Sequence, residues 1–290
     1  MRRAGISLAL ALLLGCGKEP PPPAPPAPPV KPVPPEPPLP PLAEVRLRDW
    51  SDVEEETFLQ LPDPTSPPGL KWDFSSGKRY GYDFSETLNQ KIERRAGDRK
   101  ASYGSREKNR GVFEFAAGRD RTALAMMKIQ TVEAYINDTA VPRDSEDKQK
   151  PQGSVSECVV SEDGTTDEVK AKGLADSRLY LQSLFSLQTG THELVPGRIS
   201  TRRAGYFKVG RYECVRLESE FEMAGEKPSE RHLLRGRVVS FFSFEERKFI
   251  RASASVSSST RANALAKEGI WSTSLMDAVT HYRVKFLESP

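Results

Sequence analysis

The sequence predicts a mainly β protein of the α+β class, built on a strongly curved antiparallel sheet or half-barrel with one or two packed helices. Apolar and polar residues alternate over long stretches between residues 78 and 286, and short polar turns join these stretches. Such alternation is typical of strands with one buried face, and short connections join antiparallel neighbours. A sheet with one apolar face has to cover it, either by curling or by receiving a helix.

The chain begins with the basic Met1-Arg2-Arg3, followed by an apolar run from Ala4 to Leu14. Eleven apolar residues are too few to cross a bilayer about 30 Å thick as a helix. This combination is typical of a signal peptide.

Leu13-Leu14-Gly15-Cys16 resembles the lipobox of bacterial lipoproteins, except that a residue smaller than Leu14 is commoner at its position. The resemblance implies cleavage before Cys16 and transfer of diacylglycerol to its thiol, so that the membrane is a partner through this anchor. Gly17 stands where an aspartate signals inner-membrane retention, which favours the outer membrane of the cell envelope. An ordinary secretory signal with an incidental cysteine is the alternative.

A proline tract follows, in which 15 of the 22 residues from Pro20 to Pro41 are proline. Proline fixes its own φ and extends the residue before it, so the tract favours a polyproline II rod of roughly 70 Å. A ligand for a proline-recognising domain is the alternative. The expected organisation is a signal peptide (1–15), a lipid-anchored tether (16–41), an irregular lead-in (42–77) and a β-rich body (78–290).

The body carries almost no net charge. Four of the 43 basic and two of the 40 acidic residues precede residue 42, which leaves 39 against 38. A nucleic-acid-binding protein would show a basic face, so we expect none of that activity. If Cys16 is lipidated, Cys158 and Cys214 remain, and an even remainder in an oxidising compartment makes one disulfide a candidate. Two unpaired cysteines on separate strands are the equal alternative.

The first part of the body predicts three strands. Tyr80, Tyr82 and Phe84 begin a half-buried strand that runs to Ile92, and further strands are expected at 111–117 and 122–136. Between the first two lies a basic run that we expect to be a hairpin loop. This loop could bind an anionic partner such as an envelope glycolipid or a cell-wall polymer, or be simply solvated. Its candidate residues are Arg94, Arg95, Arg99, Lys100, Arg106, Lys108 and Arg110.

Residues 137–153 are polar and predict a loop, and 155–160 and 166–170 predict a hairpin around Glu162-Asp163-Gly164. The helical spacing of Leu174, Leu181, Leu184 and Phe185 predicts the best helix of the body over 174–188.

The last third predicts strand after strand. Strands are expected at 199–209, 212–223, 231–244 and 249–258, with a closing strand at 282–286. Residues 261–276 predict a short helix around Ala264, Leu265 and Ile270.

This order of elements, together with the lipobox, is similar to lipoprotein families that carry or bind lipids on a curved sheet, and to uncharacterised envelope lipoproteins of the same plan. The similarity covers about residues 78–288 and rests on pattern, so it transfers no functional residue.

No catalytic or cofactor motif stands out. The three histidines, His192, His232 and His281, lack partners at metal-ligand spacing, and there is no G-x-S-x-G elbow or phosphate-cradling loop. Serines at 253–259 predict a solvated strand face. We therefore expect no cofactor, no metal and no enzyme activity, although a dispersed catalytic site remains an alternative.

The leading hypothesis is a membrane-anchored envelope lipoprotein that binds a hydrophobic ligand or a protein partner. A structural spacer or assembly subunit with a solid core is the second hypothesis. They differ in whether the concave face encloses an apolar cavity. Inward-facing aromatic side chains are the candidate ligand-lining residues, although each taken singly fits an ordinary core: Tyr80, Tyr82, Phe84, Phe221, Phe242, Phe244 and Phe286.

Overall fold

The structure is a computed structural model of the 290-residue chain. It describes residues 34–44, 47–75, 77–118, 120–141, 154–171, 185–194, 197–266 and 269–287. The chain divides into two units, Met1–Pro34 and Pro35–Pro290, and the second holds the fold.

The described residues form one short helix and thirteen strands. In chain order these are α1 (Trp50–Val53), β1 (Leu59–Leu61), β2 (Arg79–Ala96), β3 (Arg99–Ala117), β4 (Thr122–Ile136), β5 (Thr139–Ala140), β6 (Ser154–Ser161), β7 (Thr166–Ala171), β8 (Gly190–Leu194), β9 (Gly197–Val209), β10 (Tyr212–Lys227), β11 (Glu230–Ser243), β12 (Lys248–Leu265) and β13 (Trp271–Phe286).

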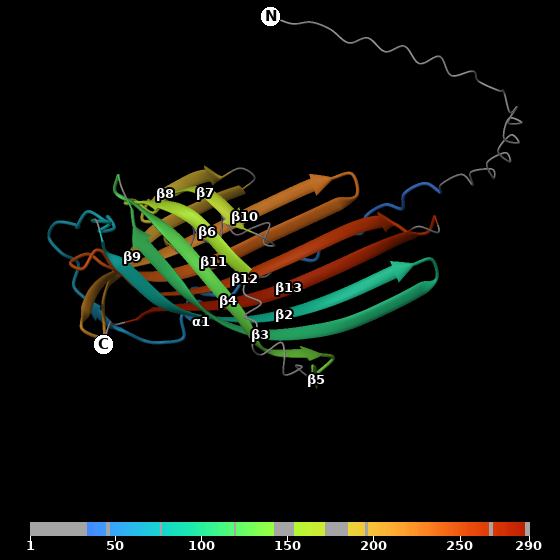
Figure 1. Cartoon of the computed structure of the whole chain (residues 1–290), viewed down its shortest axis with the longest axis horizontal. Helices are drawn as coiled ribbons and strands as arrows, with labels where there is room; N and C mark the ends of the chain where they lie inside the picture. Colours follow the sequence, from blue (N-terminus) through green and yellow to red (C-terminus); the bar gives the residue numbers. More distant parts are fainter. Residues whose placement is uncertain are drawn as a thin grey trace, which may run out of the picture. The chain divides into compact units, whose positions relative to one another are not determined.

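All strands belong to one antiparallel sheet in the order β1-β9-β10-β11-β12-β13-β2-β3-β4-β6-β7, with β8 beside β9 and β5 beside β4. The sheet curls strongly, so that β3, β4 and β6 cross in front of β11 and β12 in Figure 1. It stays open, since this path ends at β1 and at β7. The predicted fold class, a curved antiparallel sheet, is confirmed.

The concave face of the sheet is filled at one end by an aromatic core. Trp72, from the lead-in, is fully buried, and its ring lies 4.9 Å from that of Phe115 on β3 and 5.2 Å from that of Phe249 on β12. Phe185 lies between the same two strands, 4.8 Å from Phe115 and 5.6 Å from Phe249. Two residues from outside the long strands therefore join the walls of the curled sheet.

Gly164, in the β6–β7 turn, fits closely against the segment that carries Phe185. A Cβ at Gly164 would lie 2.1 Å from the carbonyl oxygen of Phe185, and its φ of +84° suits only glycine comfortably. The turn also accepts a hydrogen bond from the Leu187 amide to the Asp163 carbonyl at 3.1 Å. The predicted hairpin thus fixes the position of Phe185.

The outer face of β11–β13 is covered by residues 35–44 and 47–58, which we call the strap. Near its start, Glu36 accepts hydrogen bonds from Ser229 and Asn263, at 3.0 and 3.1 Å. Near its end, Glu54 forms a buried ion pair with Arg251. The tether that the sequence assigned to 16–41 therefore gives its last residues to the folded body.

The strap also corrects the prediction for the serine-rich strand. Ser253, Ser255, Ser257 and Ser259 point to the outer face of β12 and are each at most 6% exposed, where we expected a solvated face. The Ser259 hydroxyl accepts a hydrogen bond from the Ala43 amide at 3.0 Å, and that of Ser253 donates one to Glu54 at 2.8 Å. Small hydroxyl side chains leave room for an extended segment to lie on the strand.

The helix predicted over 261–276 is wrong, because the segment forms the end of β12, a turn and the start of β13. Leu265 pairs with Trp271 across this turn. Alanine and leucine favour helices intrinsically, but β11 and β2 on either side offer hydrogen-bond partners to the whole hairpin.

The helix predicted over 174–188 lies mostly outside the described residues. Only residues 185–188 are described, and Phe185 and Leu187 among them are buried. The strands predicted from residue 78 onward are confirmed where the structure describes them, and β4 has the predicted bounds.

Candidate functional site

The concave face changes from closed to half-open along the strands. On β12 the concave-facing residues Ala252, Ala254 and Val256 are 1%, 2% and 6% exposed. Beyond them Ser258 and Thr260 are half-buried. The aromatic core therefore ends partway along the sheet, and the concave face continues beyond it.

The same change occurs on the neighbouring strands. On β2, Tyr82 and Phe84 are buried, whereas Leu88 and Ile92 further along are half-buried. Met276 on β13, paired with Ile92, is also half-buried. We call this part of the sheet the half-open region, and its concave positions are Leu88, Gln90, Ile92, Leu234, Ser258, Thr260, Met276 and Ala278.

Two rings lie flat on the β10–β11 side of the concave face. Phe221 lies over Gly236, where an added Cβ would meet the ring at 2.3 Å, and His232 lies over Gly225, where it would meet the imidazole at 2.1 Å. Each ring covers the glycine directly opposite it. Because these rings lie along the sheet, they fill less of the space above it.

One edge of the half-open region is polar. The Asn109 side-chain amide on β3 donates a hydrogen bond to Glu86 on β2 at 2.5 Å, and Ser105 donates one to Gln90 at 3.1 Å. Burial raises the pKa of Glu86, and the hydrogen bonds from Asn109 and Tyr282 oppose that increase.

Asn109 is the most unusual residue of this edge. It is 7% exposed, and among the residues that the structure describes nothing donates a hydrogen bond to its side-chain oxygen. A buried acceptor without a donor costs about 1–3 kcal/mol, so this oxygen is suited to receive an N–H or O–H group from a bound molecule.

The seven candidate ligand-lining aromatics all lie at the closed end of the concave face or beside it. Tyr80, Tyr82, Phe84, Phe221 and Phe242 belong to the buried core, and Phe244 and Phe286 pack against it. The space between them is filled by protein side chains such as Trp72 and Phe185. They form a core there, and Phe84 and Phe221 among them also border the outer-face hollows described below.

The seven candidate basic residues do not form a loop, because β2 and β3 extend through them to a turn at residues 97 and 98. Arg94, Arg95, Arg99 and Lys100 lie at the tip of this hairpin. Arg106 lies over the Tyr135 ring and Lys108 pairs with Glu133, both across the β3–β4 ladder. Arg110 lines a separate outer-face hollow. Backbone partners on both sides, β13 and β4, explain the extension.

Cys214 is a free thiol that is fully buried on the outer face of β10, under the strap. The candidate disulfide with Cys158 is therefore not formed. Cys158 is on β6, where it pairs with Ala125 of β4, and six strands lie between β6 and β10 in the sheet order. The side chain of Cys158 lies outside the described atoms. Cys16, the candidate lipidation site, lies outside the described residues.

The histidines lie apart from one another. His192 is in the middle of β8 and His232 covers Gly225. His281 faces outward from β13, where burial lowers its pKa. Within the described part of the chain no three His, Cys, Asp or Glu side chains come together as a metal site.

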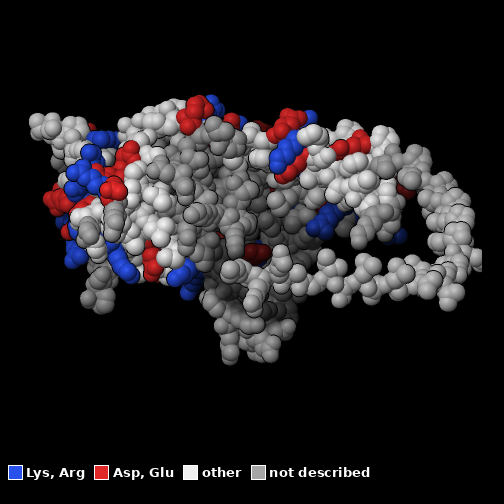
Figure 2. All heavy atoms as spheres, turned by 45° about the horizontal axis from the view of Figure 1, so that its top comes forward, with Lys and Arg blue, Asp and Glu red and all other residues white. Residues whose placement is uncertain are grey.

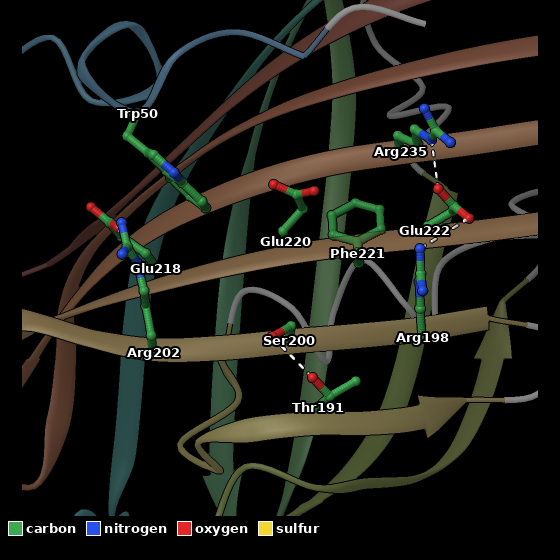
Figure 3. A pocket seen from close by; sticks show the side chains of 10 residues that line it. All are labelled: Trp50, Thr191, Arg198, Ser200, Arg202, Glu218, Glu220, Phe221, Glu222 and Arg235. Carbon is green, nitrogen blue, oxygen red and sulfur yellow. Dashed lines mark hydrogen bonds and ion pairs between the residues drawn. The ribbon is translucent and has the colours of Figure 1, made fainter.

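The outer face has open hollows of a different character. The hollow of about 450 Å³ over β9–β11 is lined by three arginines and three glutamates that alternate across the strands, with Trp50 at its rim (Figure 3). Arg202 pairs with Glu218 at 2.7 Å, and Arg235 with Glu222 at 2.6 Å. The charges compensate one another, and Figure 2 shows basic and acidic side chains mixed over the face in view.

A second outer-face hollow, of about 370 Å³, contains Arg110, Arg283 and Lys285. Arg251 in its wall is held by Glu54 and Glu56, and Arg283 by Glu55. Strap carboxylates thus satisfy part of its positive charge.

Sequence reasoning missed the residues that define the concave face most sharply. Trp72 and Phe74 lie in a stretch that read as irregular, although their alternation with Lys71 and Asp73 was a weak signal. No pattern marked Asn109, because its role depends on the β2–β3 register.

Comparisons with known proteins identify no family. No family model and no curated protein matches the chain. Among solved structures, lipovitellin shares 11% identity over 75% of this chain, with a TM-score of 0.43, and this chain spans 26% of its length. A DUF1329 family protein from Desulfovibrio piger shares 10% identity over 71% of this chain and 85% of its own, with a TM-score of 0.19.

The monoaromatic hydrocarbon channel TodX shares 6% identity over 74% of this chain and 91% of its own, with a TM-score of 0.20. At these scores the similarities carry no functional argument. Among the described residues, no helix has the length and apolar character needed to span a membrane.

Proposed function

We propose that this chain is a non-enzymatic, membrane-anchored lipoprotein of the bacterial cell envelope whose half-open region binds a hydrophobic ligand. One observation carries the proposal: the concave face continues past its aromatic core as half-buried apolar and small side chains, such as Leu88, Ile92 and Met276. A sheet that served only as a scaffold would gain stability by continuing the large side chains of the core.

The floor of the half-open region suits an extended acyl chain. Gly236 and Ala278 lie at its inner end, and Phe221 lies flat over the first of them. Small residues leave the sheet surface low, while Leu88 and Ile92 on β2 supply apolar contact. Burying one CH₂ group contributes about 0.8 kcal/mol, so several carbons in contact are enough for useful affinity.

The polar edge favours a particular head group. The Asn109 side-chain oxygen is an acceptor without a donor among the described residues, and the Glu86 and Glu107 carboxyls lie on the same edge. These groups suit a ligand whose polar end donates hydrogen bonds, such as a hydroxyl or an amine. They disfavour a ligand that ends in a carboxylate.

The anchor is proposed on the lipobox-like Leu13-Leu14-Gly15-Cys16. Several acyl chains on one cysteine would attach the protein firmly, and outer-membrane sorting follows from the Gly17 argument. Cys16→Ser should release the protein from membranes that have been washed with high salt. If this variant sediments with membranes as the parent does, the anchor is refuted, and the ligand proposal is not affected.

Native mass spectrometry tests the ligand proposal. The purified chain should bind 1-monomyristoylglycerol, which offers hydroxyl donors, more tightly than myristate. Ser258→Trp would fill the half-open region, since Ser258 is half-buried and pairs with Leu234 and Ala278. This variant should lose the complex, whereas Val279→Trp, on the outer face beside it and 38% exposed, should keep it. Equal binding by both variants would refute the site.

The solid aromatic core favours one alternative, a structural spacer. Trp72 and Phe185 are at most 2% exposed and pack against each other in the closed end, as a purely mechanical part would require. A spacer predicts that neither probe binds and that no lipid co-purifies. That result would replace the ligand proposal.

A further inference from the structure

Three hairpins end together at one end of the sheet. The β2–β3, β12–β13 and β10–β11 turns all lie at the right-hand end of Figure 1. The aromatic residues of the core on β2, β3 and β12 lie toward the other ends of these strands. Ser272, the second residue of β13, pairs with Ala96, the last residue of β2, so the first two tips are direct neighbours. We call this end, with residues 91–100, 265–266 and 269–271, the distal end.

The β12–β13 tip is apolar and exposed. Leu265 is 42% exposed and Ile270 49%, and both flank the turn. Trp271, which begins β13, is half-buried beside them. Tryptophan at the edge of an exposed apolar group is characteristic of a surface that meets the interface between water and lipid.

The adjacent β2–β3 tip is basic. Residues 91–100 contain Lys91, Arg94, Arg95, Arg99 and Lys100 against two acidic residues. Glu93 pairs with Arg95 and Lys100, at 2.5 and 3.0 Å, but both cations remain more than half exposed. Arg94 and Arg99 are exposed as well. The excess positive charge complements an anionic surface.

The strap enters the fold at the same end. Glu36, among its first residues, contacts Ser229 in the β10–β11 turn and Asn263, two residues before the end of β12. The folded body therefore begins at the distal end.

We propose that the distal end docks onto an anionic lipid surface, with Leu265, Ile270 and Trp271 inserted at the interface and the basic β2–β3 tip on the lipid phosphates. The apolar tip supplies burial and the basic tip supplies charge, and neither needs the half-open region to be occupied. The docking is thus independent of the ligand proposal. It would place the half-open region with its exposed end toward the lipid.

The test uses the whole chain bound to vesicles that contain phosphatidylglycerol with brominated acyl chains, which quench tryptophan fluorescence on contact. Trp72 is fully buried in the aromatic core. Trp50 is a half-buried residue of the strap that lies against Arg237, seven residues along β11 from the β10–β11 turn, so quenching at the interface should come from Trp271. The quenched fraction should disappear in Trp271→Phe. It should also fall when phosphatidylcholine replaces phosphatidylglycerol or when salt is raised.

Charge variants distinguish an effect of the basic residues at the tip from an effect of the protein's net charge. Each basic residue near an anionic surface contributes about five-fold, so Arg94→Gln with Arg99→Gln should lower the docked-to-undocked ratio about thirty-fold. Arg106→Gln with Lys108→Gln removes the same charge from the same hairpin. Lys108 lies nine residues behind Arg99, roughly 30 Å away and several Debye lengths from the surface, so this control should dock normally.

Two variants of exposed apolar residues complete the test. Ile270→Asp should abolish quenching, whereas Leu124→Asp, at a residue 41% exposed at the other end of the sheet, should not. Quenching that survives Trp271→Phe, or that falls equally in tip and control variants, would overturn the proposal. High salt weakens the docking but not an acyl anchor, so sedimentation after a high-salt wash reports the anchor separately, and loss of the anchor and loss of docking give different results.

Discussion

The attachment of the strap to the sheet gives the most specific prediction, because this attachment depends on one buried ion pair. Glu54 is 6% exposed and Arg251 9%. The Arg251 Nε and one terminal nitrogen donate to the two Glu54 oxygens at 2.9 and 3.0 Å. Ser253 donates a further hydrogen bond to Glu54 at 2.8 Å. The carboxylate therefore joins the strap to β12 at three points.

Removing Glu54 should destabilise the body strongly. Leaving one partner of a buried ion pair without the other costs about 3–5 kcal/mol. Glu56 still holds Arg251 at 2.7 Å, from a side chain that is 59% exposed, so we expect the lower end, about 3 kcal/mol for Glu54→Ala. For a body of this size that corresponds to a fall in Tm of about 6–12 °C.

Urea denaturation followed by circular dichroism measures this change. Glu226→Ala is the matched control, because Glu226 pairs with Arg231 at 2.7 Å between side chains that are 66% and 44% exposed. An exposed pair contributes at most about 1 kcal/mol. The double variant Glu54→Leu with Arg251→Met should recover most of the loss, since an apolar pair replaces a buried ionic one at little cost.

The result that refutes this reasoning is a Glu54→Ala variant no less stable than Glu226→Ala. The strap would then lie on the sheet without contributing to the cooperative fold. An unchanged dependence on urea concentration, with a lower midpoint, would support the expected mechanism, because it means that the same surface is exposed on unfolding.

Two further predictions follow from buried groups. Burial raises the pKa of the Cys214 thiol to about 12, so a thiol reagent at pH 8 should leave Cys214 unlabelled in peptide mapping until denaturant is added, and rapid labelling in the native state would show that the strap opens readily. Burial also raises the pKa of Glu86 above 4.5, so the folded state binds this proton more tightly than the unfolded state, and stability falls as the pH rises above about 4.5. Glu86→Gln should therefore be more stable than the parent at pH 7, and the difference should shrink as the pH falls toward 4.5; a difference independent of pH would contradict this.

The sheet could be predicted because its strands carry a strong period of two. On β2, the apolar Tyr80, Tyr82 and Phe84 alternate with polar or small residues, and the strand was predicted from this pattern. The strand predicted over 122–136 has the bounds of β4. The prediction of a loop between Arg94 and Arg110 was wrong because charged residues occupy both faces of the strands there, which hides the alternation of apolar and polar residues. The strands form nonetheless because β13 and β4 supply backbone partners for the extended hairpin.

The strap and the polar edge could not be predicted, for a different reason. A proline-rich segment has no period, so the sequence gives no indication that residues 35–44 lie on a sheet. The serine row of β12 is equally compatible with water or with a docked segment. Asn109 and Glu86 meet only through the β2–β3 register, which local sequence does not determine.

The two ends of the sheet differ in packing: the closed end is densely packed, and the distal end is more exposed. At the closed end, rings from β2, β3, β11, β12, the lead-in and Phe185 pack together, and large buried side chains of this kind each contribute about 1.5–3 kcal/mol. At the distal end the same strands continue with small, half-buried or exposed side chains, held mainly by backbone hydrogen bonds to their neighbours. The strands extend beyond the aromatic core, and there the strap supplies packing on the outer face. This explains why the strap lies along β12 from Asn263 to Arg251. The concave side of that extension is thereby left available for a ligand.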